Sequence, residues 1–338
     1  MSVLIRPKHA LCAAALLTLG LPATSTFAQV PPALAQVDAL EGLFGAQPTF
    51  RRSGAKGVCA SGYFVGNAQG MALAPSSIFS GQRLPVVARF SVGGGSPKAS
   101  DKGRSVRGLA FSISTPDGQQ WQGSSVSAPV FFVSRPEQFA PFLQARTPDP
   151  ATGKPNPERL KAFNDANPDT LRQAAYLAKA PVPASYASAQ YWSTNAFELV
   201  STRGESQFAR WQFVPEAGLT GLTDDELKTR PDDFLADELR LRVKAAAASF
   251  AFQFQLARPG DAIDDPTQAW PPERTVVTAG RLVIDSVEPG AGGACDKISF
   301  NPLALPAGIR PSSDPVLLAR PAPYALSQGR RLGEAATR

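Results

Sequence analysis

Alternation of hydrophobic and polar residues divides much of the chain into short β-strands. Segments with aromatic and β-branched residues at every second position, bounded by turn residues, are typical of strands that bury one face. Several of these segments are close enough in sequence to form hairpins, which favours an antiparallel barrel. The predicted strands are 62–66, 85–91, 107–115, 121–126, 196–201, 207–214, 248–256 and 275–287.

Helical spacing of hydrophobic residues appears between and after these strands. Three segments in the middle of the chain begin with proline at the first helical position and form a predicted helical insertion. Together with the strands they predict an α+β fold, an eight-stranded antiparallel barrel with helical insertions and a C-terminal helix. The predicted helices are 36–44, 136–146, 157–164, 168–178, 223–243 with a break at Pro231, and a last one from Pro315 toward Arg331.

The N-terminal residues have the pattern of a secretory signal peptide. Basic residues Arg6 and Lys8 precede the apolar run Ala10–Leu21, and a small-residue motif ends at Ala28. The apolar run is shorter than the roughly 20 residues that a membrane-crossing helix needs. We therefore expect residues 1–28 to be removed, residues 29–338 to form a single domain, and the mature protein to be periplasmic with no membrane attachment.

Charge and composition exclude several classes of function. The formal net charge is +6, but Lys and Arg are scattered among acidic residues, so nucleic-acid binding is not expected. The single histidine, His9, lies in the predicted signal peptide. The mature part therefore lacks the imidazole of a Ser-His-Asp triad, a histidine zinc site or a histidine-ligated haem. Any general base must be a carboxylate, a lysine or a tyrosine.

Two cysteines, Cys59 and Cys295, remain in the predicted mature part. An oxidising compartment permits a disulfide between them. Because the two lie far apart in sequence, the sequence leaves open whether they meet. Neither belongs to a CxxC motif, so no zinc knuckle or redox pair of that kind is predicted.

A pair near the C-terminus carries the strongest chemical signal. Positions four apart share one face of a helix, so Arg320 and Tyr324 are expected to touch. A guanidinium beside a phenol favours the phenolate, and tyrosine is a recognised axial ligand of haem. Taken alone, such a pair is more often a packing contact. Pro321 and Pro323 lack an N–H and are expected to distort the helix that carries the pair.

The residues around this pair closely resemble the haem-ligating helix of catalases and catalase-related peroxidases. The family pattern FxPxxLPxGIxPSxDPxLxxRxxxY runs from Phe300 to Tyr324. Earlier in the chain, further stretches resemble the family and stand in the family's order, at 51–59, 87–91, 107–111 and 129–133. The pattern at 259–271 resembles the shorter, peroxidase-like branch. The resemblance implies a catalase-like barrel whose C-terminal helix binds haem b.

The resemblance assigns roles on the haem-ligating side. Tyr324 matches the axial ligand of the haem iron, and Arg320 matches the residue that keeps this phenolate ionised. Arg51 and Arg89 match arginines that contact the haem propionates, to which a guanidinium can donate paired hydrogen bonds. The resemblance also marks possible walls of the haem pocket, namely Phe111, Phe131 and Phe132.

The opposite, distal side departs from the family. Gly54 stands where the family has the distal histidine, which moves a proton between the two peroxide oxygens. Ser91 matches the serine that orients that histidine, and residues 125–128, Ser-Val-Ser-Ala, lack the distal asparagine of true catalases. General acid–base catalysis contributes about 10²–10⁴-fold, so slower peroxide chemistry is expected. Lys56 and Arg52 lie close enough in sequence to be considered as replacements.

Three functions remain in competition at this point. The first is a haem peroxidase that reduces organic hydroperoxides, and hydrogen peroxide weakly, with electrons from an unknown donor. The second is a catalytically impaired haem-binding pseudoenzyme, a carrier, sensor or scaffold, which Gly54 supports. The third is a haem-free binder of small molecules in the barrel cavity, which would leave Tyr324 unexplained.

Overall fold

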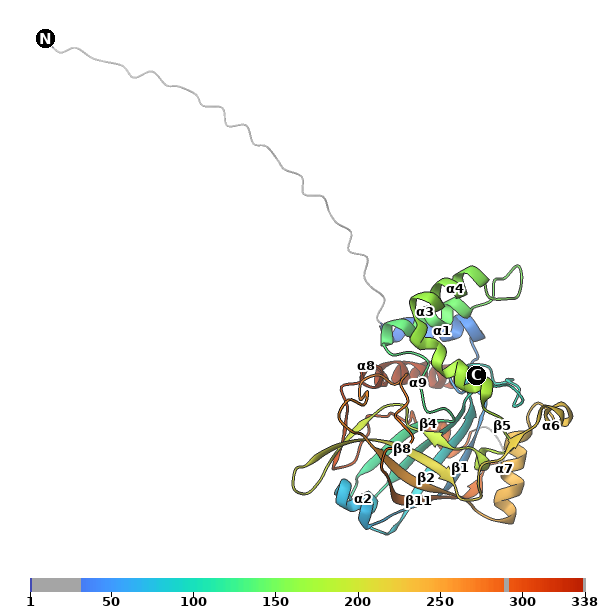
Figure 1. The fold of residues 1–338 in the computed structure, drawn as a ribbon. Helices are drawn as coiled ribbons and strands as arrows, with labels where there is room; N and C mark the ends of the chain where they lie inside the picture. The colour runs from blue at the N-terminus through green and yellow to red at the C-terminus, as the bar shows by residue number, and fades with distance from the viewer. Residues whose placement is uncertain (2–31, 289–291, 337–338) are drawn as a thin grey trace. The chain divides into compact units, whose positions relative to one another are not determined.

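An antiparallel barrel forms the centre of the computed structural model, which describes Met1, residues 32–288 and residues 292–336 (Figure 1). Eight strands follow one another in the order β10-β11-β1-β2-β3-β4-β6-β8, and β8 pairs back with β10. This closure pairs both edges of the sheet. The strands span Gly57–Gly66 (β1), Arg83–Val92 (β2), Arg107–Ser114 (β3), Gln120–Val126 (β4), Tyr191–Trp192 (β6), Ser206–Pro215 (β8), Ala248–Leu256 (β10) and Val276–Val287 (β11).

The predicted α+β barrel is confirmed, with one strand exchanged for another. Phe197–Val200 (β7), predicted as a barrel strand, pairs with β8 and with Ile309–Pro311 (β12) and lies outside the closed ring. The position between β4 and β8 belongs to Tyr191–Trp192. Two residues are too few to show alternation, so the sequence pattern could not reveal this strand. A separate small sheet pairs Val182–Pro183 (β5) with Gly221–Leu222 (β9).

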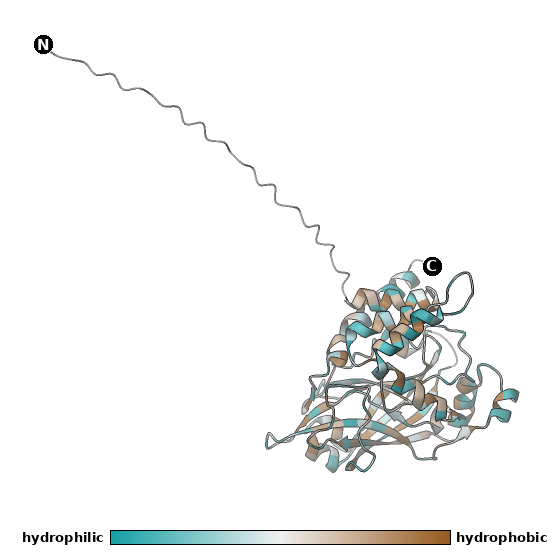
Figure 2. Ribbon diagram, turned by 45° about the horizontal axis from the view of Figure 1, so that its top comes forward, coloured by the Kyte–Doolittle hydropathy of each residue, from teal (hydrophilic) through white to brown (hydrophobic). Residues whose placement is uncertain are grey.

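Large aromatic side chains fill the barrel interior. Phe111, Trp121 and Trp211 are at most 1% exposed and meet edge to face, with ring centroids 5.3 to 6.1 Å apart. Such T-shaped contacts are favoured by the ring quadrupoles. Successive strand residues point to opposite sides of the sheet, so the residues next to each of these aromatics along its strand face outward. Hydrophobic and hydrophilic residues are accordingly interspersed along the ribbon (Figure 2).

The outward face of β1, β2 and β3 carries small side chains around one arginine. A Cβ added to Gly57 would lie 2.4 Å from the backbone oxygen of Phe90, and one added to Gly108 would lie 2.5 Å from the Oγ of Ser91. Glycine is therefore required at position 57, where the neighbour is backbone, whereas at position 108 the hydroxyl of Ser91 would have to turn away. In the strand register, the residues of this face form the rows Cys59–Arg89–Ala110 and Gly57–Ser91–Gly108.

The helices lie largely where hydrophobic spacing predicts them. The expected capping box is present, with the Thr223 side chain accepting a hydrogen bond from the backbone N of Glu226. The single predicted C-terminal helix is instead two helices that meet at Arg320, and α2 is too short to have been recognised by spacing. The helices span Pro32–Phe44 (α1), Ala68–Leu73 (α2), Phe139–Arg146 (α3), Pro157–Ala166 (α4), Arg172–Lys179 (α5), Asp224–Thr229 (α6), Phe234–Ala245 (α7), Pro315–Ala319 (α8) and Pro321–Ala336 (α9).

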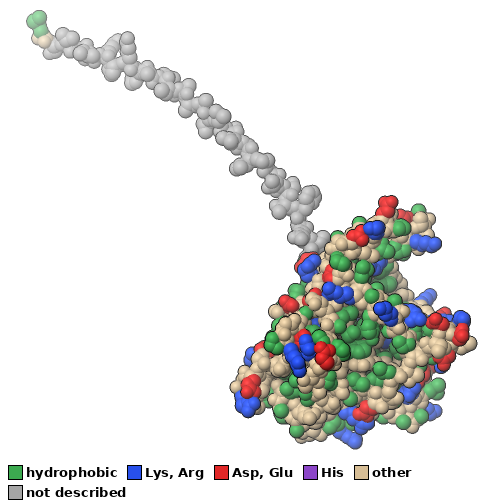
Figure 3. All heavy atoms as spheres, viewed as in Figure 1, with side chains coloured by type: hydrophobic (Ala, Val, Ile, Leu, Met, Phe, Trp, Pro, Cys, Tyr) green, Lys and Arg blue, Asp and Glu red, His purple; other side chains and the backbone are tan. Residues whose placement is uncertain are grey.

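The predicted signal peptide, apart from Met1, lies outside the described residues. Its cleavage and the division into a leader and one domain stay predictions. Across the residues that the structure describes, no helix is both long and apolar enough to cross a membrane. On the face shown in Figure 3, acidic and basic side chains are intermixed, as their scatter along the sequence suggests.

Candidate functional site

Arg320 and Tyr324 meet as their spacing predicts. The Tyr324 hydroxyl oxygen accepts hydrogen bonds from the Nε of Arg320, at 3.1 Å, and from its Nη2. Arg320 is the residue between α8 and α9, so Pro321 and Pro323 fall in the first turn of α9. The N–H groups of a first turn have no partner within the helix, so proline is tolerated there. The two prolines therefore begin a helix instead of distorting one.

A chain of hydrogen bonds continues from Arg320 into the core. Its Nη1 donates to the Oδ1 of Asn195 at 2.9 Å, and the Nδ2 of Asn195 donates to the Oδ2 of Asp314 at 2.6 Å. The other oxygen of Asp314 accepts from the backbone N of Val316 at 2.8 Å and so caps α8. Burial raises the pKa of Asp314, and the hydrogen bonds that its carboxylate accepts partly offset this. Tyr324 is thus held, through Arg320, by side chains from distant parts of the chain.

Three arginines, Arg51, Arg89 and Arg331, lie close enough to act electrostatically on one another, and Tyr324 acts on Arg51. Burial, together with the nearby charges of Arg89 and Arg331, lowers the pKa of Arg51 to about 9, while Asp296 and Tyr324 partly offset it. Burial lowers the pKa of Arg89 to about 10 and also lowers the pKa of Arg331, with Asp296 opposing both changes. A guanidinium whose pKa is lowered by burial and by neighbouring positive charges is stabilised in its charged form when an anion binds beside it.

Unpaired donors in this cluster fit the carboxylates of a haem. The Nε of Arg51 and the Nη2 of Arg331 are buried and have no hydrogen-bond partner among the described residues. Because buried polar groups are nearly always paired, such donors indicate an acceptor that the chain itself does not supply. Guanidinium groups bind carboxylates through paired hydrogen bonds, and the phenol of Tyr324 is a recognised type of haem ligand. The residues present therefore fit the expected cofactor.

Sequence reasoning missed three residues of this site, Arg331, Asn195 and Asp314. Arg331 follows Tyr324 by two turns of α9 and so lies on the same face, a spacing that could have revealed it. Asp314 lies in the family pattern quoted above, but neither its place there nor the position of Asn195 indicates that the two would meet beside Arg320. They are 119 residues apart in sequence and meet only through tertiary structure.

On the distal side, Gly54 faces Ser91. The φ angle of Gly54 is +62°, in the left-handed region that favours glycine. A Cβ added there would lie 3.2 Å from the Oγ of Ser91 and 3.6 Å from the Nη1 of Arg89. The Ser91 side chain makes no hydrogen bond within the described part of the chain. A larger residue at position 54 would therefore crowd Ser91 and strain the backbone.

Lys56 and Arg52, the two possible replacements for the histidine, are occupied elsewhere. The Nζ of Lys56 donates to two backbone carbonyls, at 2.8 and 2.9 Å, and pairs with the buried carboxylate of Asp101 at 2.8 Å. Arg52 is 4% exposed and forms ion pairs with Glu41 and Glu334. Both cations brace neighbouring segments, and neither is placed to exchange protons beside Gly54.

The predicted aromatic walls occupy different places. Phe111 lies in the barrel interior, away from the outward face that carries Arg89. The ring of Phe132 packs against Phe131, Phe139 and Phe142, with centroids 4.4, 5.2 and 4.7 Å away. Phe132 therefore contributes to the packing of α3, and its contact with a cofactor stays a prediction.

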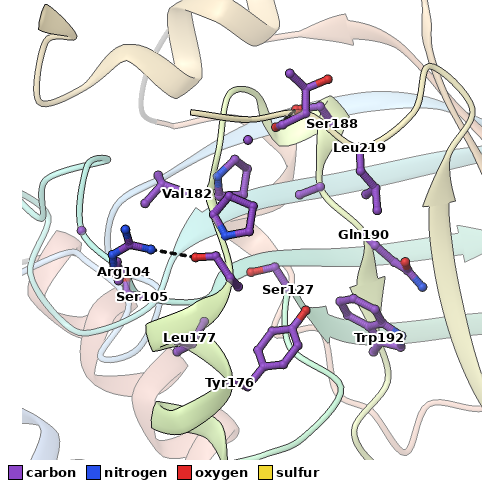
Figure 4. Close-up of a pocket in the computed structure, with 17 residues that line it drawn as sticks. Arg104, Ser105, Ser127, Tyr176, Leu177, Val182, Ser188, Gln190, Trp192 and Leu219 are labelled. Carbon is purple, nitrogen blue, oxygen red and sulfur yellow. Dashed lines mark hydrogen bonds between the residues drawn. The ribbon is translucent and has the colours of Figure 1, made fainter. Parts of the chain in front are cut away.

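A separate pocket of about 200 Å³ contains none of the predicted site residues (Figure 4). Tyr176 and Trp192 lie side by side on one wall, with ring centroids 6.3 Å apart. Arg104 is at the opposite end and donates to the backbone oxygen of Ala180 at 2.8 Å. The lining is mainly apolar, so this pocket differs in chemistry from the arginine cluster near Tyr324.

Comparison with known proteins agrees with this geometry. Residues 49–338 match the catalase family. The chain is 41% identical over 295 residues to a catalase-related peroxidase of Synechococcus elongatus, with 87% of each chain covered. It is 34% identical over 298 residues to a catalase-related peroxidase of Mycolicibacterium paratuberculosis, covering 88% of this chain and 94% of the other. A fungal catalase structure superposes with a TM-score of 0.77 at 22% identity, over 85% of this chain and 60% of that one, which is a similarity of fold alone.

Proposed function

This chain belongs to the catalase family, and we therefore propose that it is a haem peroxidase that reduces organic hydroperoxides and, weakly, hydrogen peroxide. The observation that carries the proposal is the hydrogen-bonded pair of Arg320 and Tyr324 together with the arginine cluster, in which two donors are buried and unpaired among the described residues. Haem-free binding in the barrel is not favoured, because aromatic side chains fill the barrel interior.

The residues of the chain divide the task of holding the cofactor. Tyr324 would be the axial ligand, with Arg320 donating two hydrogen bonds to its oxygen. The carboxylates would be bound by Arg51, Arg89 and Arg331. When bound, haem supplies the redox chemistry of peroxide reduction. We propose unmodified haem b, because Cys59 and Cys295 are bonded to each other and neither offers a thiol for covalent attachment.

The distal residues support the proposed preference for organic hydroperoxides. Gly54 places no side chain where the family has the distal histidine, and Ser91 beside it offers a hydroxyl donor. No imidazole is present to move a proton between the peroxide oxygens, so the contribution of about 10²–10⁴-fold from general acid–base catalysis is lost. We infer that glycine leaves more room than a histidine for the substituent of an organic hydroperoxide, and that hydrogen peroxide, which has no such substituent, is the poorer substrate.

The proposal also includes a cellular compartment and an electron donor. The signal-peptide pattern of residues 1–28 supports export to the periplasm. A peroxidase also needs an electron donor, which we expect to be a separate molecule. The alternative function is a haem-binding pseudoenzyme, and the left-handed backbone at Gly54, which disfavours any side chain there, is the observation in its favour.

The test compares peroxide turnover with free haemin. The protein is purified from haem-supplemented cells, and its activity is measured with cumene hydroperoxide and with hydrogen peroxide. We expect turnover above that of haemin with the organic substrate and a smaller gain with hydrogen peroxide. Gly54→Ala, which adds a methyl group on this side, should lower kcat/KM for cumene hydroperoxide more than for hydrogen peroxide. Full haem loading with turnover equal to that of haemin would favour the pseudoenzyme.

A further inference from the structure

A disulfide joins the barrel to the segment before the ligand helix. Cys59 of β1 and Cys295 of η5, a short 3₁₀ helix spanning Ala294–Lys297, are bonded, with Cα atoms 5.4 Å apart and a sequence separation of 236. Both cysteines are buried, at 3% and 0% exposed, in a small cluster with Phe300. In the β1–β2 pairing Cys59 stands directly opposite Arg89. The bond is therefore anchored in the row of residues that carries one arginine of the site.

The segment held by the disulfide also orients Arg51. The Nη2 of Arg51 donates to the backbone oxygens of Cys295, at 2.8 Å, and Ile298, at 2.7 Å. Its guanidinium lies over the ring of Phe300, 5.4 Å from the centroid. These contacts place the Arg51 side chain while leaving its buried Nε without a partner in the described structure. The direction in which Arg51 presents that donor thus depends on where residues 295–298 lie.

The same segment contacts the helix that carries Tyr324. The Nε2 of Gln328, one turn after Tyr324 on α9, donates to the backbone oxygen of Lys297 at 2.8 Å. The carboxylate of Asp296 lies within 4.8 Å of the two sulfurs. Asp296 also acts electrostatically on Arg51, Arg89 and Arg331. One short segment therefore touches the barrel, the arginine cluster and α9.

We propose that the Cys59–Cys295 disulfide is a positioning element of the haem site, which holds residues 295–298 where they orient Arg51 and support α9. This rests on the proposed haem function and deepens it. Without the bond, the segment loses its covalent link to the row of Arg89, and only non-covalent contacts hold it. Arg51 then no longer has its two carbonyl acceptors at a fixed place. Weakening one charge-assisted contact, here the proposed one between Arg51 and a haem carboxylate, corresponds to about a tenfold loss of ligand affinity.

The experiment removes the bond and measures haem affinity apart from activity. Cys59→Ala/Cys295→Ala and wild-type apoprotein are titrated with haem, and the Kd is obtained from the absorbance change. We expect the Kd to rise about tenfold. Leu239→Ala serves as control, because this side chain is fully buried on α7 and its removal destabilises the fold without touching the site. An unchanged Kd in the cysteine variant, with a lowered Tm, would show the bond to be a general staple only and would overturn the proposal.

A double-mutant cycle tests whether the disulfide acts through Arg51. Arg51→Met removes the guanidinium, so removing the disulfide in that background should change the Kd by less than threefold while lowering the Tm as before. An undiminished tenfold effect in the Arg51→Met background would overturn the proposed route. If the cysteine variant does not fold, wild-type protein is folded first and then reduced with a water-soluble phosphine, which is oxidised as the disulfide becomes two thiols. Haem titration of the reduced protein then gives its Kd. A tenfold rise supports the proposal, and an unchanged Kd overturns it, as for the cysteine variant.

A hydrogen-exchange measurement separates this proposal from the proposed function. If wild-type apoprotein does not bind haem, the proposed function fails, and the positioning role is read from amide exchange in the apoprotein. Loss of the disulfide should then speed exchange in residues 294–300 and 321–336, and Leu239→Ala should not. Equal exchange in these residues with and without the bond would overturn the positioning role.

Discussion

The two sides of the candidate haem site differ in how firmly their side chains are held. On the tyrosine side, Tyr324, Arg320, Asn195 and Asp314 form an unbroken chain of hydrogen bonds that ends at the cap of α8. On the distal side, Gly54 has no side chain, and Ser91 has no hydrogen-bond partner among the described residues. The tyrosine side is held in place by hydrogen bonds, whereas Gly54 offers no group that could move a proton.

Under the proposed function, cofactor binding and acid–base chemistry would rest on separate elements. The tyrosine side belongs to α8, α9 and the residues before β7, whereas Gly54 precedes β1 and faces β2. A change at position 54 therefore leaves the hydrogen bonds of Tyr324 intact. The arginine cluster joins the two sides, because Arg51 and Arg89 come from the barrel side and Arg331 from α9.

Removing the phenol oxygen of Tyr324 should have the largest effect, a loss of haem affinity on the tyrosine side. Tyr324→Phe removes the atom that accepts both hydrogen bonds from Arg320, and with it the proposed axial ligand. We expect haem affinity to fall by more than the roughly 10–100-fold that outer-shell partners of a metal ligand contribute. Absorbance titration of the apoprotein measures this. Tyr176→Phe, in the separate pocket, is the matched control and should bind haem as the wild type does. Equal affinity in the two variants would contradict the role of Tyr324.

Breaking the chain of hydrogen bonds at Asn195, one step beyond Arg320, should have an intermediate effect on haem affinity. Asn195→Ala removes the acceptor of the Arg320 Nη1 and a donor to the buried Asp314. We expect haem affinity to fall about tenfold and the haem absorbance bands to shift, because Arg320 becomes free to reorient. Gln190→Ala removes a side-chain amide whose Nε2 donates to the Oε1 of Gln212 at 3.0 Å, and is the control. Unshifted bands in Asn195→Ala would mean that Asn195 has only a structural role.

The smallest effect is expected on the distal side. Gly54→Ala should lower stability by the roughly 1–2 kcal/mol that a Cβ costs in the left-handed region, and further by its contact with Ser91. Gly204→Ala is the matched control, because Gly204 also has a positive φ, +76°, but a Cβ there meets nothing within 4 Å. Denaturant unfolding of the apoproteins gives both values. Equal losses would show that crowding by Ser91 is negligible, and haem affinity should stay unchanged in both variants.

The hydrophobic pattern predicted most of the fold, and its failures have local causes. Alternation located the long strands within one or two residues at most of their ends, and only β1 begins well before its predicted start, at Gly57. The pattern missed Tyr191–Trp192 because two residues cannot alternate. It also overlooked that Pro321 and Pro323 begin a new helix, since a proline that would break a helix interior is suited to a first turn.

By itself, the sequence determined the features that depend on near neighbours along the chain. The strand and helix periods, the contact of Arg320 with Tyr324, and the lack of a histidine at position 54 are of this kind. Only the tertiary structure decided which distant groups meet. Asn195 reaches Arg320 across 125 residues, and Cys59 reaches Cys295 across 236. Such contacts depend on how the barrel closes and how the helices pack on it, which no local period encodes.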